Sequence, residues 1–462
     1  MLKDTGVSVI VTTQGKNLGF LRECLSSLKK QILRPFEAIV VEDSESPSRA
    51  KSISRGLQYL HGSFGSVTKA RDAAYKLSDP VAPFVMFLDH DDKVSPNYIL
   101  ACSESMKALD LDVAYPSIQV FGQSNDLLVP PKRFSREKLF TQNYIVTSAL
   151  IRKSAFDEAG GWDHRIHRYP DWELWLRMSG SPHNFRFGWV DVPFLYRFHK
   201  DQMSASSDLG FHHASRYMVK LKHGEITLFT PFSGKKDIIR RYLDALEKLD
   251  FPKEKIHLVF YDNSGSLEFR LLLERFLNSA KRAYASTTLF VDPRPIYHHG
   301  DEGRAKRTSE IYSFLGLTAK TPFAFIVEDD VIITSDTLKR LLFDLCLSDD
   351  VAAVGAAVIC RHSGDFMAYS IRPSQDKNNP IMRRILSRST GLDEAYVSFS
   401  CMLVDLWKLE GMKVPPNLNG YCGSDWAFCD WVNQKGFRTL VDWGLRPIHL
   451  NEDGKPAEIV RK

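Results

Sequence analysis

The sequence predicts an α/β protein with two domains in tandem, each built on a mostly parallel mixed sheet flanked by helices. Its 462 residues exceed what one hydrophobic core usually serves and suit two domains of roughly 200 to 250 residues. Each half opens with an apolar β-rich run, a helical pattern and a second apolar run, which is the order of a βαβ unit. The same order of acidic and histidine residues also occurs twice, over residues 7–199 and 226–449, which indicates two copies of one fold.

The first half supplies its elements in a regular order. Residues 7–13 (VSVIVTT) are apolar and β-rich, the pattern of a strand buried on both faces. Residues 18–31 carry leucines at helical spacing, and residues 36–41 return to a strand pattern. Residues 67–77 predict a second helix and residues 84–88 a further strand. These elements form parallel βαβ units with right-handed crossovers.

Acidic residues follow two of these strands. Glu42 and Asp43 come after one, and Asp89 and Asp91 lie in FLDHDD after the other. Ligands of open α/β sheets bind outside the carboxyl ends of the strands, so these groups are expected to face one crevice. Two carboxylates on one side of a strand end suit Mg²⁺ or Mn²⁺ bridging two phosphates, where the ion neutralises charge on a leaving diphosphate. The alternative is an acidic turn after a buried strand, which is a common structural feature.

Two further residues of the first half are candidates for chemistry. Asp171 stands in YPDWELW, where Pro-Asp is a typical helix start. Its carboxylate either satisfies free N–H groups there or acts as a general base held by the aromatic residues beside it. His199 in YRFH is either an ordinary histidine or the nitrogen ligand of a metal site otherwise made of oxygens. His449, at the matching place in the second half, favours the ligand.

The second half repeats the pattern. Strands and helices alternate as before, with strands at 226–230, 256–261 and 323–327 and helices at 237–249 and 304–315. Acidic residues again follow the strands, at Asp262 and at Glu328, Asp329 and Asp330. A Ser-rich polar stretch at 201–210, then a short helix at 211–222, separates the halves. The expected organisation is a first domain over residues 1–205, a linker helix over 206–223 and a second domain over 224–462.

Composition narrows the class of protein. A hydrophobic content of 44% with 25% charged residues is typical of globular proteins, and no apolar run reaches the roughly 18 residues needed to cross a bilayer. The beginning of the chain leaves no room for a signal peptide, so a cytoplasmic location is expected. Seven scattered cysteines do not suggest a disulfide framework. The net charge of +5 is dispersed, which permits but does not demand a polyanionic partner such as nucleic acid.

Six motifs in one order resemble a known family. VSVIVTTQ, VVEDS, GSVTKARDAA, FLDHDD, GGWDHRIHRYPDWELWLRM and YRFH together resemble the family 2 glycosyltransferases of the GT-A fold. The resemblance implies that Thr12 and Asp43 line the nucleotide base and ribose, with uracil read by Asp43, and that Glu42 stands at the usual first Asp of that turn. It further implies a diphosphate contact at Arg71, a metal-binding Asp-x-Asp at Asp89 and Asp91 supported by His199, and the catalytic base of inverting members at Asp171. Pro170 departs from the family, since many members have an acidic residue there, so the acceptor or its contacts are expected to be unusual.

The second half resembles divergent GT-A enzymes that extend mannans or glycosylate collagen-type acceptors, through ITLFTPF, LVFYDNS and FIVEDDV. The match to the first half implies nucleotide-sugar contacts at Thr230, Asp262, Arg307 and Glu328, metal ligands at Asp330 and His449, and a catalytic residue at Asp425. Glu328 in place of the first metal Asp, and Asn263 in place of Asp43, leave its donor preference open.

The expected protein is a glycosyltransferase that depends on Mn²⁺ or Mg²⁺ and moves a sugar from a nucleotide diphosphate donor, with UDP-sugar favoured by the resemblance, to an acceptor hydroxyl with inversion. One transfer site per domain is expected. Two alternatives stay open: a single active N-terminal transferase whose second domain binds acceptor or forms a dimer, and a phage-type enzyme that glycosylates DNA bases. The acceptor, whether glycan, protein or modified nucleic acid, and a homo-oligomeric state are not fixed by the sequence.

Overall fold

The chain folds into two compact units. The computed structural model describes residues 6–199, 209–294, 304–361, 364–371, 382–384, 390–415 and 424–458. The first unit comprises residues 1–223 and the second residues 224–462. The helix predicted to link the halves is α8 (Leu209–His223), which belongs to the first unit. Most of the stretch predicted as a polar linker lies outside the described residues.

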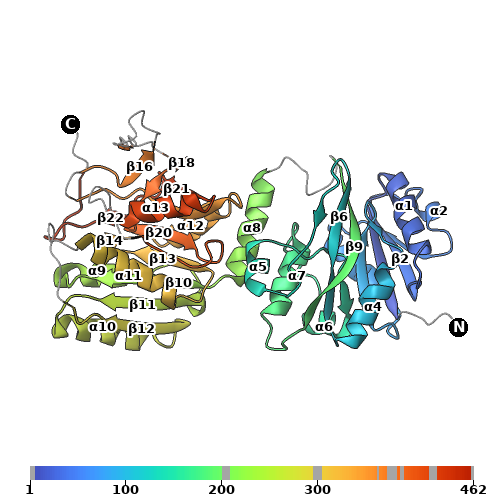
Figure 1. Ribbon diagram of the computed structural model, residues 1–462, viewed down its shortest axis with the longest axis horizontal. Coiled ribbons are helices and arrows are strands. Elements are labelled where there is room, and N and C mark those ends of the chain that lie inside the picture. The colour runs from blue at the N-terminus through green and yellow to red at the C-terminus, as the bar shows by residue number, and fades with distance from the viewer. Residues whose placement is uncertain are drawn as a thin grey trace. The chain divides into compact units, whose positions relative to one another are not determined.

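The first unit is a mixed sheet with helices around it (Figure 1). Its strands are β1 Val7–Thr13, β2 Glu37–Asp43, β3 Gln58–Gly62, β4 Phe84–Asp89, β5 Lys93–Val94, β6 Val113–Gly122, β7 Leu127–Leu128, β8 Leu150–Arg152 and β9 Phe187–Phe198. Its helices are α1 Leu18–Lys29, α2 Ala50–Ile53, α3 Val67–Tyr75, α4 Tyr98–Ala108, α5 Arg136–Thr141, α6 Lys153–Glu158, α7 Pro170–Ser179 and α8. The strand order is β3-β2-β1-β4-β8-β6-β9-β5, and the strands from β3 to β4 run parallel.

The second unit has the same plan. Its main sheet contains β10 Ile226–Phe232, β11 Ile256–Asp262, β12 Ser286–Val291, β13 Phe323–Val327, β15 Val351–Ala356, β18 Leu392–Glu394, β20 Cys401–Asp405 and β21 Arg438–Asp442. Two small sheets contain β14 Val331–Ile332 with β22 Ile448–His449, and β16 Ala368–Ile371 with β17 Met382–Arg384 and β19 Tyr396–Val397. Its helices are α9 Lys236–Glu247, α10 Leu267–Ala280, α11 Arg304–Thr318, α12 Thr337–Leu345 and α13 Ser424–Gln434, with a 3-10 turn at Lys253–Lys255.

The two main sheets have the same strand order, in agreement with the repeat that the sequence indicates. The order β12-β11-β10-β13-β20-β15-β21 in the second sheet matches β3-β2-β1-β4-β8-β6-β9 in the first. The directions agree as well: β8 and β20 run antiparallel to both neighbours, whereas β6 with β9 and β15 with β21 are parallel pairs. The predicted fold class, two mixed sheets with parallel strands flanked by helices, is therefore confirmed.

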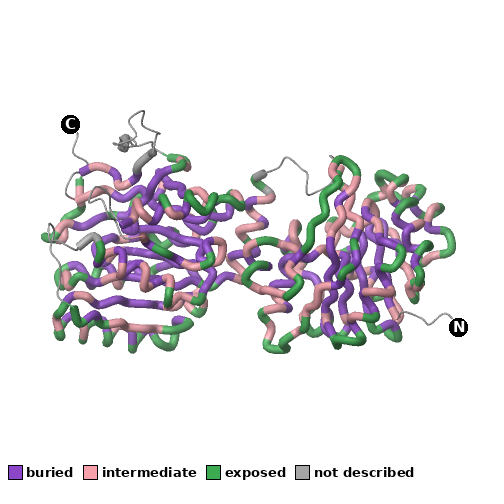
Figure 2. The backbone as a smooth tube through the Cα atoms, in the orientation of Figure 1, coloured by how far each residue is buried: buried purple, intermediate pink, exposed green. Residues whose placement is uncertain are grey.

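Apolar strands account for the two cores. Every residue of β1 is buried, as the continuous apolar run predicts, and β13 is buried throughout. In Figure 2 the strands of both sheets are mostly purple, whereas green segments lie mainly on outer helices and loops. The predicted first helix ends two residues early, at Lys29, and β2 continues through Asp43 because its ladder with β3 runs on to the pair Asp43 and Gly62.

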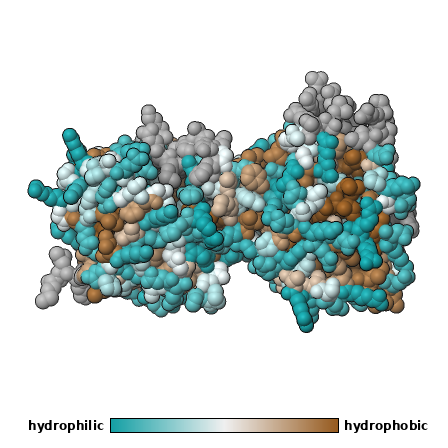
Figure 3. Space-filling model, turned by 180° about the vertical axis from the view of Figure 1, so that it is seen from behind, coloured by the Kyte–Doolittle hydropathy of each residue, from teal (hydrophilic) through white to brown (hydrophobic). Residues whose placement is uncertain are grey.

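The surface and the cysteines fit a globular chain. Teal hydrophilic residues dominate the visible face of each unit, with brown apolar patches between them (Figure 3). Within the described ranges, no helix combines the length and the apolar character needed to cross a bilayer. The six cysteines in those ranges are free thiols, five of them buried, and Cys422 lies outside the described residues.

Candidate functional site

The carboxyl ends of β1 and β2 bring the predicted residues Thr12, Glu42 and Asp43 to one edge of the first sheet. Thr12 lies in register with Val41 on one side and Asp89 on the other. Its hydroxyl is buried and has no hydrogen-bond partner among the described residues. An unpartnered buried hydroxyl is uncommon, and it leaves Thr12 with unused hydrogen-bonding capacity beside Asp89.

Glu42 is committed to the fold itself. Its carboxylate accepts hydrogen bonds from the Tyr59 hydroxyl at 2.5 Å, the Ser44 hydroxyl at 2.8 Å and the Ser48 amide at 2.8 Å. Burial raises the pKa of Glu42, but these hydrogen bonds outweigh burial and the pKa lies below its ordinary value. Gly15, at φ 72°, approaches this carboxylate so closely that an added Cβ would lie 2.5 Å from Oε1. Glu42 therefore shapes the turn that follows β2.

Asp43 opens onto a pocket of about 720 Å³. Its Oδ1 accepts hydrogen bonds from the amides of Phe64 at 2.7 Å and Gly65 at 3.1 Å, which fix the carboxylate against the next loop. Most of the residues that line the pocket have polar side chains, and they include charges of both signs: Gln14, Lys16, Asp43, Ser44, Glu45, Ser63, Gly65, Ser66, Val67, His167 and Arg168. Its volume lies within the range of about 300 to 1,000 Å³ that is typical of small-ligand sites.

Arg71 links two of the predicted acidic residues. Its guanidinium is buried, donates to Asp89 Oδ1 at 2.7 Å and lies over the Trp162 ring with 5.2 Å to the ring centroid. The positive charge of Arg71 also acts on Asp171, where it opposes the rise in pKa. Arg71 is therefore placed by α3 within electrostatic reach of both carboxylates.

Strand pairing explains how Asp91 meets His199. The short strand β5 begins just after Asp92 and pairs antiparallel with β9, so the chain leaving β9 passes back over the acidic turn. Arg197 accordingly donates its amide to Asp92 at 2.8 Å, and His199 Nε2 lies 3.0 Å from Asp91 Oδ2. These two predicted metal ligands are brought together, whereas Asp89 turns to Arg71.

Asp171 occupies the first turn of α7, after Pro170 at the first helical position. Its Oδ2 accepts hydrogen bonds from Asn143 at 3.2 Å and from the Thr147 hydroxyl at 3.1 Å. Burial raises the pKa of Asp171. The hydrogen bond from the Trp172 amide and the charge of Arg71 lower the pKa but offset the effect of burial only in part. A raised carboxyl pKa strengthens the group as a base and is a common feature of catalytic carboxylates.

The second unit gathers a tighter group. Among the described residues, three potential metal ligands lie with their ligand atoms within 4.8 Å of one another at Glu328, Asp330 and His449. The antiparallel pairing of β14 with β22 sets Val331 opposite His449, which delivers the imidazole to the acidic turn. His449 donates from Nδ1 to the Ile359 carbonyl at 2.8 Å and lies 3.4 Å from Asp330 through Nε2.

Two cationic side chains also reach Asp330, and neither is among the residues predicted for the site. Lys235 Nζ donates to Asp330 Oδ2 at 2.6 Å, and Arg361 donates to the same oxygen at 2.8 Å. Burial raises the pKa of Asp330, but His449 and Lys235 outweigh burial and hold the pKa well below its ordinary value. The only sequence signal was the pair Lys235 and Lys236 soon after a predicted strand; Arg361 carries none.

The other predicted residues of the second unit divide into two kinds. Asp425 lies in the first turn of α13, and burial followed by the charge of Glu328 raises its pKa to about 6. The remaining three are committed to the fold. The Thr230 hydroxyl bonds to Tyr242 in the core, Asp262 accepts from the Ser264 amide at 2.9 Å, and Arg307 pairs with Asp292.

The available ligands fit a hard divalent cation. Carboxylate oxygens and an imidazole nitrogen are suitable ligands for Mn²⁺, and oxygen ligands suit Mg²⁺. In the first unit the fitting pair is Asp91 and His199. In the second unit the buried Oδ1 of Asp330 has no hydrogen-bond partner in the described part of the chain, which leaves an acceptor for a cation beside Glu328 and His449.

A sequence-family model described as glycosyl transferase family 2 matches residues 8–162. YwdF, an uncharacterized glycosyltransferase of Bacillus subtilis, is 27% identical over 233 residues, which are 47% of this chain and 84% of that protein. An uncharacterized glycosyltransferase of Methanocaldococcus jannaschii is 21% identical over 195 residues, and the match covers 39% of this chain and 66% of that protein. The O-antigen biosynthesis protein RfbC of Myxococcus xanthus is 21% identical over 312 residues, 59% of this chain but 24% of that protein.

Solved structures of S. aureus TarS are similar at a lower level. The complex of TarS residues 1–349 with UDP-GlcNAc shares 19% identity at a TM-score of 0.39, over 47% of this chain and 64% of that one. The complex of the same TarS fragment with UDP shares 15% sequence identity at a TM-score of 0.35, over 67% of this chain and 79% of that one. These structural similarities are too weak to support a functional argument. The family match and the relatives named as glycosyltransferases do support one: residues 8–162 are a family 2 glycosyl transferase domain, and the chain that carries them is a glycosyltransferase.

Proposed function

We propose that the first unit transfers a sugar from a nucleotide diphosphate donor, with UDP-sugar favoured, to an acceptor hydroxyl with inversion. The observation that carries this proposal is the convergence of Arg71, Asp89 and Asp171 beside the Asp91–His199 pair, at the carboxyl ends of parallel strands. In this proposal the pocket beside Asp43 receives the base and ribose, and Thr12 supplies a further hydroxyl at the strand end.

Each side chain then has a chemical role. Asp171 accepts the proton of the acceptor hydroxyl as that oxygen attacks the anomeric carbon, and the bond from that carbon to the diphosphate oxygen breaks with its electron pair on the diphosphate. Arg71 offsets the negative charge that develops on the leaving group, and its contact with Asp89 keeps the guanidinium in place. A single displacement of this kind inverts the configuration of the sugar.

Asp91 and His199 are the residues that would hold Mn²⁺ or Mg²⁺ in the first unit. When bound, such an ion supplies positive charge to the diphosphate.

For the second unit we propose a second transfer site, so that the chain is bifunctional. Glu328, Asp330 and His449 would hold the cation, and Asp425 would act as the base. The pKa of about 6 for Asp425 supports this role, because a carboxyl poised near neutral pH both accepts and releases a proton readily.

One observation favours a different role for the second unit. Lys235 and Arg361 already neutralise Asp330, so a cation would have to displace at least one of them or share the carboxylate. The second candidate function is therefore a single active transferase in the first unit, joined to a second unit that binds acceptor or forms a dimer.

A donor screen on the full chain separates these functions. Purified protein is mixed with Mn²⁺ and a panel of UDP-, GDP- and TDP-sugars, and release of nucleoside diphosphate is measured for the wild type and for Asp91→Ala and Asp330→Ala. We expect UDP-sugars to be used, Asp91→Ala to remove one activity and Asp330→Ala to remove a second that differs in donor or product. Asp453→Ala, at an exposed aspartate, is the matched control and is expected to retain both.

The outcomes distinguish the proposals. Retention of every activity in Asp330→Ala would leave the second unit without a transfer role. An Asp91→Ala variant as active as Asp453→Ala would overturn the first site.

A further inference from the structure

The last helix of the first unit, α8, is embedded in that unit. Val219, Lys220, His213 and Ser215 on this helix are buried. Lys220 lies over the Phe140 ring with 5.3 Å to the ring centroid, which ties the helix to α5. A helix that only tethered two domains would make few contacts with either, so the packing of Lys220 on α5 indicates a structural role for α8 within the first unit.

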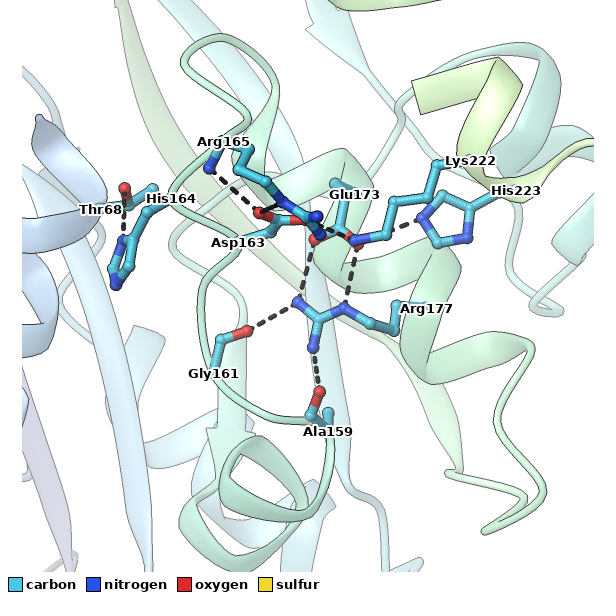
Figure 4. Close-up of polar contacts among 10 residues, drawn as sticks. All are labelled: Thr68, Ala159, Gly161, Asp163, His164, Arg165, Glu173, Arg177, Lys222 and His223. Atoms are coloured by element: carbon cyan, nitrogen blue, oxygen red, sulfur yellow. Dashed lines mark hydrogen bonds and ion pairs between the residues drawn. The ribbon is translucent and has the colours of Figure 1, made fainter. Parts of the chain in front are cut away.

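Residues at the carboxyl end of α8 contact the first turn of α7 and the loop that precedes it. Lys222 Nζ lies 2.6 Å from Glu173 Oε1 and 2.6 Å from Asp163 Oδ2. His223 Nε2 lies 3.2 Å from the same Glu173 oxygen. Glu173 is fully buried, and Figure 4 shows Lys222 and His223 converging on it from α8 while the Asp163 loop meets Lys222 from the other side.

The amino-terminal part of α8 holds the same segment at a second point. His212 bonds to Arg168, and the Tyr169 hydroxyl lies 2.8 Å from His212 Nδ1. His212 and Lys222 are ten positions apart, so the two points lie about 15 Å apart along the helix axis. Two separated contacts restrain the orientation of a segment as well as its distance.

The segment between these points carries the candidate base. Tyr169, two residues before Asp171, has the left-handed backbone angle φ 57°, which is strained for a residue with a side chain. Arg177 fixes the start of the segment by donating to the Ala159 and Gly161 carbonyls, while its guanidinium pairs with Glu173 at 2.9 Å (Figure 4). A strained backbone persists only where surrounding contacts determine it, and the contacts from α8 meet that need.

We propose that α8 is a positioning element of the transfer site, whose Lys222, His223 and His212 hold residues 161–173 so that Asp171 is aimed at the acceptor and Arg168 stays in the pocket wall. This inference rests on the proposed function of Asp171. It assigns the helix to the catalytic unit in place of the linker role expected from the sequence, and it makes three residues outside the reacting groups determinants of turnover.

The test uses full-length Lys222→Met, which keeps the length of the side chain and removes its charge. Hydrogen–deuterium exchange is measured for backbone amides of residues 161–173, and turnover is measured as UDP release from the UDP-sugar selected by the donor screen, with water as acceptor. We expect faster exchange in this segment and a fall in kcat of about 10- to 100-fold, because small misplacements of a reacting group cost that much. The dissociation constant for UDP is expected to stay unchanged, since His212 still holds Arg168.

Two controls separate positioning from general damage. Lys222→Arg retains the charge and is expected to restore slow exchange and most of kcat. Lys339→Met removes a lysine of similar exposure, 33% against 30%, from its ion pair with Asp250 at 2.7 Å, and is expected to change neither quantity.

Each outcome of this experiment either supports or overturns the positioning role of α8. Unchanged exchange in Lys222→Met, or faster exchange with full kcat, overturns the positioning role. A weaker binding of UDP with an unchanged kcat overturns the positioning role as well. If Asp171→Asn keeps full turnover, the base assignment fails; if Asp171→Asn is impaired while Lys222→Met is not, only the role of α8 fails.

Discussion

Replacing Glu173 with Gln is expected to destabilise the first unit by about 3 kcal/mol. Burial raises the pKa of Glu173, but His223, Arg177 and Lys222 outweigh burial and bring the pKa from 4.5 to about 2. A difference of about two and a half pKa units, at about 1.36 kcal/mol each, corresponds to about 3 kcal/mol of stability from the ionised group. Removing one partner of a buried ion pair typically costs about 3 to 5 kcal/mol, which agrees.

The sign of the pH dependence follows from the lowered pKa. A carboxyl whose folded pKa is depressed contributes its full stabilisation above the unfolded pKa of 4.5. The contribution is lost as the pH falls from about 4.5 through about 2. The wild type should therefore converge toward the stability of Glu173→Gln in acid, and the difference between them should be largest near neutral pH.

Urea unfolding of the full chain, followed by circular dichroism and tryptophan fluorescence at pH 7, measures the difference. With a slope of about 2 kcal/mol/M, the transition of the first unit is expected to move down by about 1 to 2 M. Glu268→Gln is the matched control, because Glu268 is exposed and its ion pair with Lys236 lies at the surface, where such pairs contribute about 0 to 1 kcal/mol. Equal midpoints for Glu173→Gln and Glu268→Gln would refute the reasoning.

Two further predictions concern acidic groups with raised pKa values. Turnover by the first unit should fall on acidification through a pKa above the ordinary aspartate value, because burial raises the pKa of Asp171 and only its ionised form is a base; a rate profile flat down to pH 4 contradicts this. Asp425→Asn should raise the unfolding midpoint of the second unit at pH 7 while removing its transfer activity, since the pKa of about 6 means that ionised Asp425 is destabilising above that pH. Asp344→Asn is the control, because burial and Asp442 raise the Asp344 pKa to about 7 on α12; it should stabilise without loss of activity. Equal activities of the two variants would contradict a catalytic role for Asp425.

The strands that position the site could be predicted because their signal is local. The bounds of β1 and β13 agree with the sequence to the residue, since each is a continuous apolar run that a buried parallel strand requires. The strand β3 was not predicted, because QYLHG is short and half polar, and only its ladder with β2 makes it a strand. Its absence also shortened the expected end of β2.

Partners distant in sequence could not be predicted in the same way. Nothing in the sequence around Asp330 indicates Arg361, which lies 31 residues away and is brought to the carboxylate by the fold of the second unit. Glu173 and Lys222 meet across 49 residues, so the helix predicted at 211–222 could be located but not assigned to the site it contacts. The proximity of Asp91 and His199 was predictable only because the order of motifs occurs twice and resembles a known family.

Turnover of Asp171→Asn measured beside donor binding tests the assigned base most directly. UDP release from the preferred UDP-sugar is compared with that of the wild type at pH 7, and the dissociation constant for UDP is measured by calorimetry on the same samples. We expect kcat to fall by about 10²- to 10⁴-fold, the contribution typical of a general base, with UDP binding unchanged. A variant that releases UDP at the wild-type rate would contradict the role of Asp171 and, with it, the proposed mechanism of the first unit.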